Sequence, residues 1–192
     1  MKKNCAIKFF ALFTLACLLT VSAVNVTAGT AIADPKVDTV VRLGIFKGDA
    51  NGNLRLEDKI IRSEIITTFV RTLGLEEDTG TKAASLSFTD INSSHWAYNY
   101  IKTAVKYGFI AGYPDNTIGA DKNITYAEAL TLLTRILGYE EVLTSGKWPE
   151  NVVTLCTQLG ITRDTKLSLD QPITRQDVAV LIYHALSADL KK

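Results

Sequence analysis

Apolar residues recur at intervals of three and four along six stretches of the chain, the spacing of one face of an α-helix. The stretches come in pairs, and a loop rich in Gly, Asp and Asn joins the two members of each pair. The first helix of each pair is expected to end at a glycine, namely Gly44, Gly108 and Gly160. The pattern predicts an all-α protein built from three helix–loop–helix units.

The predicted core consists of the apolar faces of these helices. In the first helices these positions are Val37, Val40, Val41, then Trp96, Tyr100, Ile101, Ala104, Val105, then Val152, Val153, Cys156 and Leu159. In the second helices they are Ile65, Ile66, Phe69, Val70, Leu73, then Leu130, Leu133, Ile136, Leu137, then Val178, Leu181, Ile182, Ala185 and Leu186. One pair cannot cover its own apolar face, so we expect the three pairs to pack together.

Landmark spacing indicates that the three units are copies of one another. Arg62 and Tyr126 each lie 18 positions after the glycine of their unit, and Arg175 lies 15 after Gly160. Trp96 and Trp148 each lie 12 positions before theirs. We place the units at residues 34–77, 86–141 and 146–190, the first truncated at its start.

Each second helix begins with a capping pattern. Thr125 with Glu128 reads as a T-x-x-E capping box, Thr174 with Asp177 is the corresponding pair, and Glu64 occupies the same place in the first unit.

The N-terminus reads as a secretory signal peptide over residues 1–33. Lys2, Lys3 and Lys8 precede the apolar run 9–26, and no acidic residue occurs before Asp34. Cleavage is expected after Ala33, with Ala28 as the rival site, and a retained membrane anchor is the alternative. Cleavage leaves Cys156 as the single cysteine, which we interpret as a core thiol.

The motifs of the middle unit resemble those of the S-layer homology domain. They are Phe88-Thr89-Asp90, Trp96, the turn Gly112-Tyr113, and Ile124-Thr125-Tyr126-Ala127-Glu128 before an apolar helix. The first and third units match in part. The resemblance implies a pseudo-threefold bundle with grooves between adjacent units. It also implies non-covalent binding to a secondary cell wall polysaccharide, often pyruvylated and therefore anionic, that anchors the protein to the cell envelope.

The resemblance also implies which residues bind the glycan: Arg62, Asp90, Trp96, Gly112, Tyr113, Tyr126, Trp148 and Arg175. Tyr126 stands where the family has Arg. Capping or groove-lining roles fall to Glu64, Thr125, Glu128, Thr174 and Asp177. Free N–H groups and the dipole at a helix N-terminus suit an anion, and an arginine adds a bidentate contact. The alternative interpretation gives these residues structural roles only. In it, the acids cap helices, the tryptophans belong to the core, and the arginines pair with neighbouring acids.

Composition and motifs exclude several other classes. The chain is 47% hydrophobic and 21% charged, with 21 basic and 20 acidic residues. We therefore expect no clustered basic surface that would bind nucleic acid. The loop at Asp49 lacks the Gly and Glu that an EF-hand requires, and no metal or cofactor is predicted. No catalytic motif stands out, so we predict no enzyme. Membrane contact is not expected after signal cleavage. The alternative to wall binding is a set of degenerate repeats that contact another envelope protein or serve a structural role.

Overall fold

The computed structural model describes residues 32–76 and 85–191. Within these ranges it contains only helices: α2 (Pro35–Arg42), α3 (Arg62–Thr72), α4 (Tyr98–Lys106), α5 (Tyr126–Ile136), the short 3-10 helix η2 (Glu140–Thr144), α6 (Glu150–Gln158) and α7 (Arg175–Ala185). The all-α prediction is confirmed. The predicted signal peptide, as far as residue 31, and residues 77–84 of the linker after the first unit lie outside the described residues.

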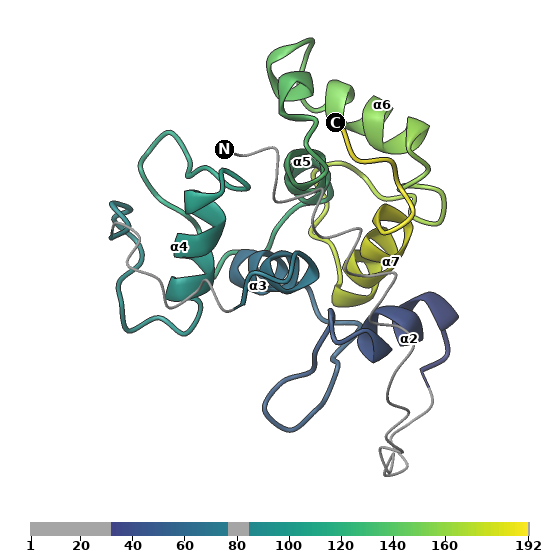
Figure 1. Ribbon diagram of the computed structural model, residues 1–192, viewed down its shortest axis with the longest axis horizontal. Coiled ribbons are helices and arrows are strands. Elements are labelled where there is room, and N and C mark those ends of the chain that lie inside the picture. The colour runs from purple at the N-terminus through teal and green to yellow at the C-terminus, as the bar shows by residue number, and fades with distance from the viewer. Residues whose placement is uncertain (1–31, 77–84, 192) are drawn as a thin grey trace.

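The three second helices occupy the centre of the molecule and the three first helices surround them (Figure 1). In this arrangement α4 packs against α3, α6 packs against α5, and α2 packs against α7. Each first helix therefore covers the second helix of the preceding unit, and the first unit covers the last. The apolar face of a unit is buried by its neighbour, which is why the three units stabilise one another.

A closed ring of backbone hydrogen bonds joins the segments that lead into the three central helices. The amide of Ile60 donates to the carbonyl of Ile173 (3.0 Å), that of Ile173 to Ile124 (3.1 Å), and that of Ile124 to Ile60 (3.2 Å). All three side chains are fully buried. Each segment thus donates to one neighbour and accepts from the other. The pseudo-threefold arrangement of whole units stays a prediction, and this ring is the observation that supports it.

Glycines with positive φ end the helices as expected. Gly44, Gly108 and Gly160 have φ of 71°, 74° and 72° and lie one residue beyond the C-caps of α2, α4 and α6. A side chain would strain this left-handed backbone, so a glycine here ends the helix at small cost.

The core contains most of the predicted apolar positions, and Trp96 is the clear exception. Trp96 is 56% exposed and Trp148 is 52% exposed, so the prediction that Trp96 is buried is wrong. Both residues precede their helices, since α4 begins at Tyr98 and α6 at Glu150, and neither belongs to an inward-facing helical turn.

Cys156 is fully buried, and burial raises the pKa of its thiol to about 11. None of the helices in the described ranges is long and apolar enough to cross a membrane.

Truncating an isoleucine of the ring should destabilise the whole molecule. Ile124→Ala removes a fully buried side chain at the junction of three segments, and we expect the free energy of unfolding to fall by about 2–5 kcal/mol. Urea unfolding followed by circular dichroism measures this. The control is Leu43→Ala, whose side chain is 42% exposed and should cost much less. Similar losses in both variants would contradict the central role of the ring.

Candidate functional site

The acidic residues at the starts of the central helices cap those helices. Glu128 accepts from the amide of Thr125 (2.9 Å), Asp177 from that of Thr174 (3.1 Å), and Glu64 from that of Ile61 (3.2 Å). The Thr125 and Thr174 hydroxyls accept in return from the amides of Glu128 and Asp177. These carboxylates therefore have a structural task before any contact with a ligand.

The first-turn amides of the central helices are already occupied by the neighbouring unit. At each helix the first two amides donate to loop carbonyls at 2.9–3.0 Å: Arg62 to Lys122, Ser63 to Ala120, Tyr126 to Gln171, Ala127 to Leu169, Arg175 to Asp58 and Gln176 to Leu56. The expectation that these N-termini present free N–H groups to an anion is wrong. These bonds between units, which flank the ring, use the donors that a lone helix would leave open.

Arg175 is engaged at every nitrogen of its guanidinium group. Nε donates to the carbonyl of Leu54 (2.7 Å), Nη2 to that of Lys47 (2.9 Å), and Nη1 lies 2.9 Å from Glu64 Oε1. The group also lies over the Phe46 ring, and the residue is 5% exposed. Arg175 thus ties α7 to the loop of the first unit and to the cap of α3.

Arg62 occupies the corresponding place at α3 but has fewer partners. Nη2 donates to the carbonyl of Ala111 (3.2 Å), and the group lies 5.0 Å from the centre of the Tyr113 ring. Its Nε is buried without a hydrogen-bond partner, and within the described residues no carboxylate forms an ion pair with it. Lys122 lies 5.7 Å from the centre of the same ring and is exposed. We call Arg62, Tyr113 and Lys122 the Arg62 cluster.

Tyr113 joins the Arg62 cluster to the cap of α5. Its hydroxyl donates to Glu128 Oε1 (2.7 Å). Burial, together with this hydrogen bond, raises the pKa of Tyr113 to about 12, so the phenol stays protonated at neutral pH.

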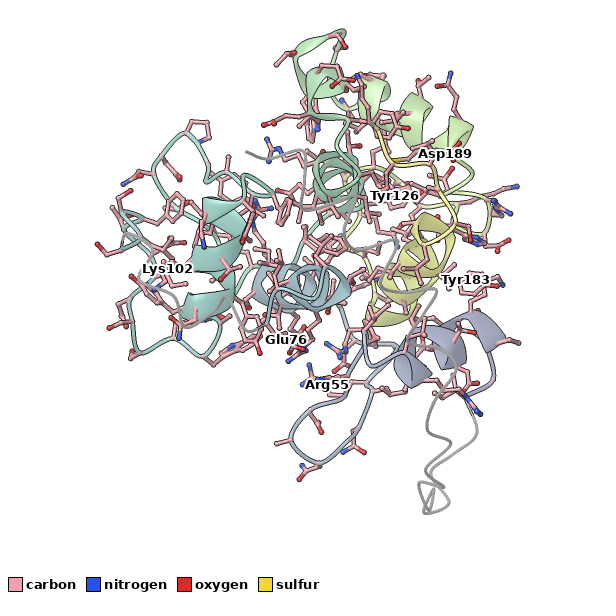
Figure 2. The ribbon with its side chains drawn as sticks, viewed as in Figure 1. Arg55, Glu76, Lys102, Tyr126, Tyr183 and Asp189 are labelled. Atoms are coloured by element: carbon pink, nitrogen blue, oxygen red, sulfur yellow. The ribbon has the colours of Figure 1, made fainter. Side chains whose placement is uncertain are left out.

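Tyr126 takes the third equivalent position, near the middle of the molecule in Figure 2. Its hydroxyl lies 3.0 Å from Thr165 Oγ1, in the loop of the third unit, and the residue is 4% exposed. Arg62, Tyr126 and Arg175 therefore perform one task, since each ties the start of a central helix to the next unit's loop. Tyr126 does so without charge.

Asp90 and Gly112 shape the loop of the middle unit. The two carboxylate oxygens of Asp90 accept from the amides of Ile118 (2.8 Å) and Gly119 (2.7 Å). A Cβ on Gly112 would lie 2.3 Å from the Phe88 ring, so only glycine fits beneath that ring. The Phe88-Thr89-Asp90 motif thus fixes the loop, and the structure gives Asp90 and Gly112 loop-building contacts.

Trp148 forms one wall of a pocket of about 300 Å³. Its indole N–H donates to Thr131 Oγ1 (3.0 Å), which fixes the orientation of the ring. The pocket is lined by Thr125, Ala127, Glu128, Trp148, Pro149, Leu169 and Asp170. It therefore brings together three of the predicted site residues. We call it the Trp148 pocket.

Sequence reasoning missed Leu169 and Asp170. The repeat alignment could have found Asp170, because it lies five positions before Arg175, as Asp121 lies five before Tyr126. Asp121 also neighbours a tryptophan site. It lies 3.1 Å from His95 Nε2, and the His95 ring stacks on Trp96. An exposed tryptophan near an acid from the end of the loop is thus present in two of the three units.

Residues 87–130 match the S-layer homology domain, and the chain contains this domain. The chain is 32% identical over 164 residues to the Middle cell wall protein of Brevibacillus brevis, which covers 81% of this chain and 15% of that protein. It is 31% identical over 153 residues to the Surface layer protein of Brevibacillus choshinensis, 76% of this chain and 14% of that one. A Cellulosome-anchoring protein of Acetivibrio thermocellus is 37% identical over 92 residues, 48% of this chain and 21% of that protein.

The chain thus spans less than a quarter of the length of each of these relatives. The domain match and the relatives identify it as a protein of the cell surface.

The two buried arginines should differ in their contribution to stability. Arg175→Ala removes one of the two arginine partners of Glu64 and leaves two loop carbonyls without their donor, and we expect a loss of about 3 kcal/mol. Arg62→Ala breaks one hydrogen bond and a stacking contact and should cost about 1–2 kcal/mol. Urea unfolding measures both. Arg42→Ala, in an exposed pair with Asp38, is the control. Equal costs for Arg175 and Arg42 would contradict these assignments.

Stability should fall in acid partly through Glu128. Burial alone would raise the pKa of its carboxyl, but hydrogen bonds from the Thr125 backbone, Tyr113 and the Thr125 hydroxyl, together with the charge of Arg62, hold the pKa below its ordinary value. A lowered native pKa contributes stability above the unfolded pKa and loses it as pH falls through the native value. The urea concentration at the midpoint of unfolding, measured at pH 7, 5 and 3, should therefore decrease less with falling pH for Glu128→Gln than for the unaltered protein. The control is Glu150→Gln, since Glu150 forms an exposed ion pair with Lys147. Its midpoint should decrease with falling pH as much as that of the unaltered protein.

Proposed function

We propose that this chain is an exported module that binds a cell wall polysaccharide non-covalently and so anchors to the cell envelope. We further propose that the polymer is a secondary cell wall polysaccharide with acidic, pyruvylated residues. The domain match and relatives named for the cell wall, the surface layer and anchoring support this proposal. The observation that supports it most directly is the pair of exposed tryptophans at matching positions, each near a carboxylate.

Both tryptophan sites combine an exposed aromatic ring, on which a sugar ring can stack, with a carboxylate that can accept hydrogen bonds from sugar hydroxyls. The face of an indole ring is electron-rich, and the C–H groups on one face of a sugar ring are electron-poor, so the two stack. Carboxylates beside the ring accept hydrogen bonds from sugar hydroxyls.

The Arg62 cluster is the place where an acidic sugar group fits best. Arg175 is neutralised by Glu64 at 2.9 Å, and Tyr126 is uncharged. Arg62 is only 5% exposed, but it has no ion-pair partner within the described part of the chain, so no salt bridge offsets its positive charge. The exposed Lys122 adds a second cation beside Tyr113. A carboxylate on a sugar would gain from both charges.

One observation favours a second candidate. The first-turn amides and the Arg175 guanidinium, which the anion-binding hypothesis requires, already bond to loops of the protein itself. Repeats whose donors are occupied in this way suit a structural role, or contact with another envelope protein through the two tryptophan surfaces.

Binding to intact walls tests the proposal. We expect the chain without its predicted signal peptide to pellet with sacculi of the producing bacterium, and not after acid extraction of the secondary polymer. Replacing both tryptophans, as Trp96→Ala with Trp148→Ala, should weaken pelleting about tenfold or more, since each stacking contact contributes roughly 0.5–1.5 kcal/mol.

Leu43→Ala is the matched control, because Leu43 is also exposed but lies outside the tryptophan sites. Failure to pellet with intact walls would favour the second candidate. Equal pelleting by the double tryptophan variant would remove the tryptophans from the binding surface.

A further inference from the structure

We propose that the Trp148 pocket holds an uncharged sugar residue, and that the acidic residue of the polymer lies next to it on the Arg62 cluster. This inference rests on the proposed function and assigns a different sugar to each of the two sites.

The charges of the Trp148 pocket disfavour an anion. Its lining contains two carboxylates, Glu128 and Asp170, and no lysine or arginine. Glu128 is ionised at neutral pH, because its hydrogen bonds hold its pKa below the ordinary value. Asp170 is exposed and makes no ion pair within the described residues. A pyruvate carboxylate placed here would meet two like charges at short range.

The remaining donors at this helix start cannot offset that repulsion. The amides of Tyr126 and Ala127 donate to the carbonyls of Gln171 and Leu169, and the amide of Glu128 donates to Thr125 Oγ1. Tyr126, at the position of the family's arginine, is buried and carries no positive charge. The pocket therefore lacks every group that would stabilise an anionic ligand.

The same lining suits a neutral sugar ring. Trp148 is held by Thr131, so its exposed face has a fixed orientation. Glu128 and Asp170 can accept from sugar hydroxyls, which gives charge-assisted hydrogen bonds. Pro149 and Leu169 supply apolar surface beside the ring. A volume of about 300 Å³ is at the small end for ligand pockets, so we assign a single residue to it.

Glu128 places the two sites next to each other. One of its oxygens accepts from Tyr113, which belongs to the Arg62 cluster, and the residue also lines the Trp148 pocket. A polymer with an acidic residue over Tyr113 and Lys122 would therefore place an adjoining neutral residue in the pocket. The alternation of charge along the polymer would set its register on the protein.

The test compares two forms of one polymer. Wall polysaccharide is released enzymatically from sacculi of the producing bacterium, and mild acid removes the ketal-linked pyruvate from half of it. Binding of each form to the signal-free chain is measured by calorimetry. Asp170→Asn should weaken binding of both forms by the same factor, about three- to tenfold, because an amide is a poorer acceptor for sugar hydroxyls. Lys122→Ala should weaken binding of the pyruvylated form only.

The direction in which Asp170→Asn changes the affinity for the pyruvylated form shows whether a neutral or an acidic sugar occupies the pocket. If the acidic sugar occupied the pocket, removing this charge would strengthen binding of the pyruvylated form, and that result would overturn the inference while leaving the proposed function intact. If neither form binds the unaltered chain, the proposed function itself fails. Asp189→Asn makes the same charge change outside the pocket and should alter nothing.

Trp148→Phe and Trp148→Ala provide an independent check. Both should weaken binding of the two polymer forms equally, the alanine variant more than the phenylalanine variant. Helical circular dichroism shows whether each variant is folded. A folded Trp148→Ala variant with unchanged affinity for both forms would exclude the pocket as a sugar site.

Discussion

Three backbone hydrogen bonds in a closed ring, between Ile60, Ile124 and Ile173, determine the rest of this structure. They fix the segments leading into the central helices at one point, with all three side chains buried. The amides that follow along each helix start must then bond to the adjacent loop. Burial of unpaired amides would cost free energy, so the ring and the flanking bonds stabilise each other.

This constraint explains why the anion-binding geometry inferred from sequence is absent at the helix starts. A helix N-terminus attracts anions because its first amides lack partners. Here the partners come from the neighbouring unit, and Arg175 is used in the same way by the loop at Lys47 and Leu54. In the proposed function, recognition falls to groups outside the ring: two exposed tryptophans, the acids near them, and the cations of the Arg62 cluster. The three units share one backbone plan but differ in these outer side chains.

The sequence predicted the fold well because the fold depends on local signals. Apolar spacing, the glycines at helix ends and the capping boxes each act within a few residues, and the structure forms them as expected. The exposure of Trp96 could not be predicted from spacing, because the residue precedes the helix that was predicted to contain it. The partners of Arg175 were also beyond reach, since Lys47 and Leu54 lie over a hundred residues away in the sequence. Asp170 enters the site only through packing between units, although the repeat alignment offered a clue to it.

Packing of α2 against α7 has a consequence for how such modules can evolve. In an open-ended helical solenoid each new repeat adds to a free surface, so length can change by duplication. Here the outermost faces of the first and last units already cover each other (Figure 1). Within the described residues a fourth helix pair could pack on α7 only by displacing α2, so duplication of a single pair would disrupt this contact.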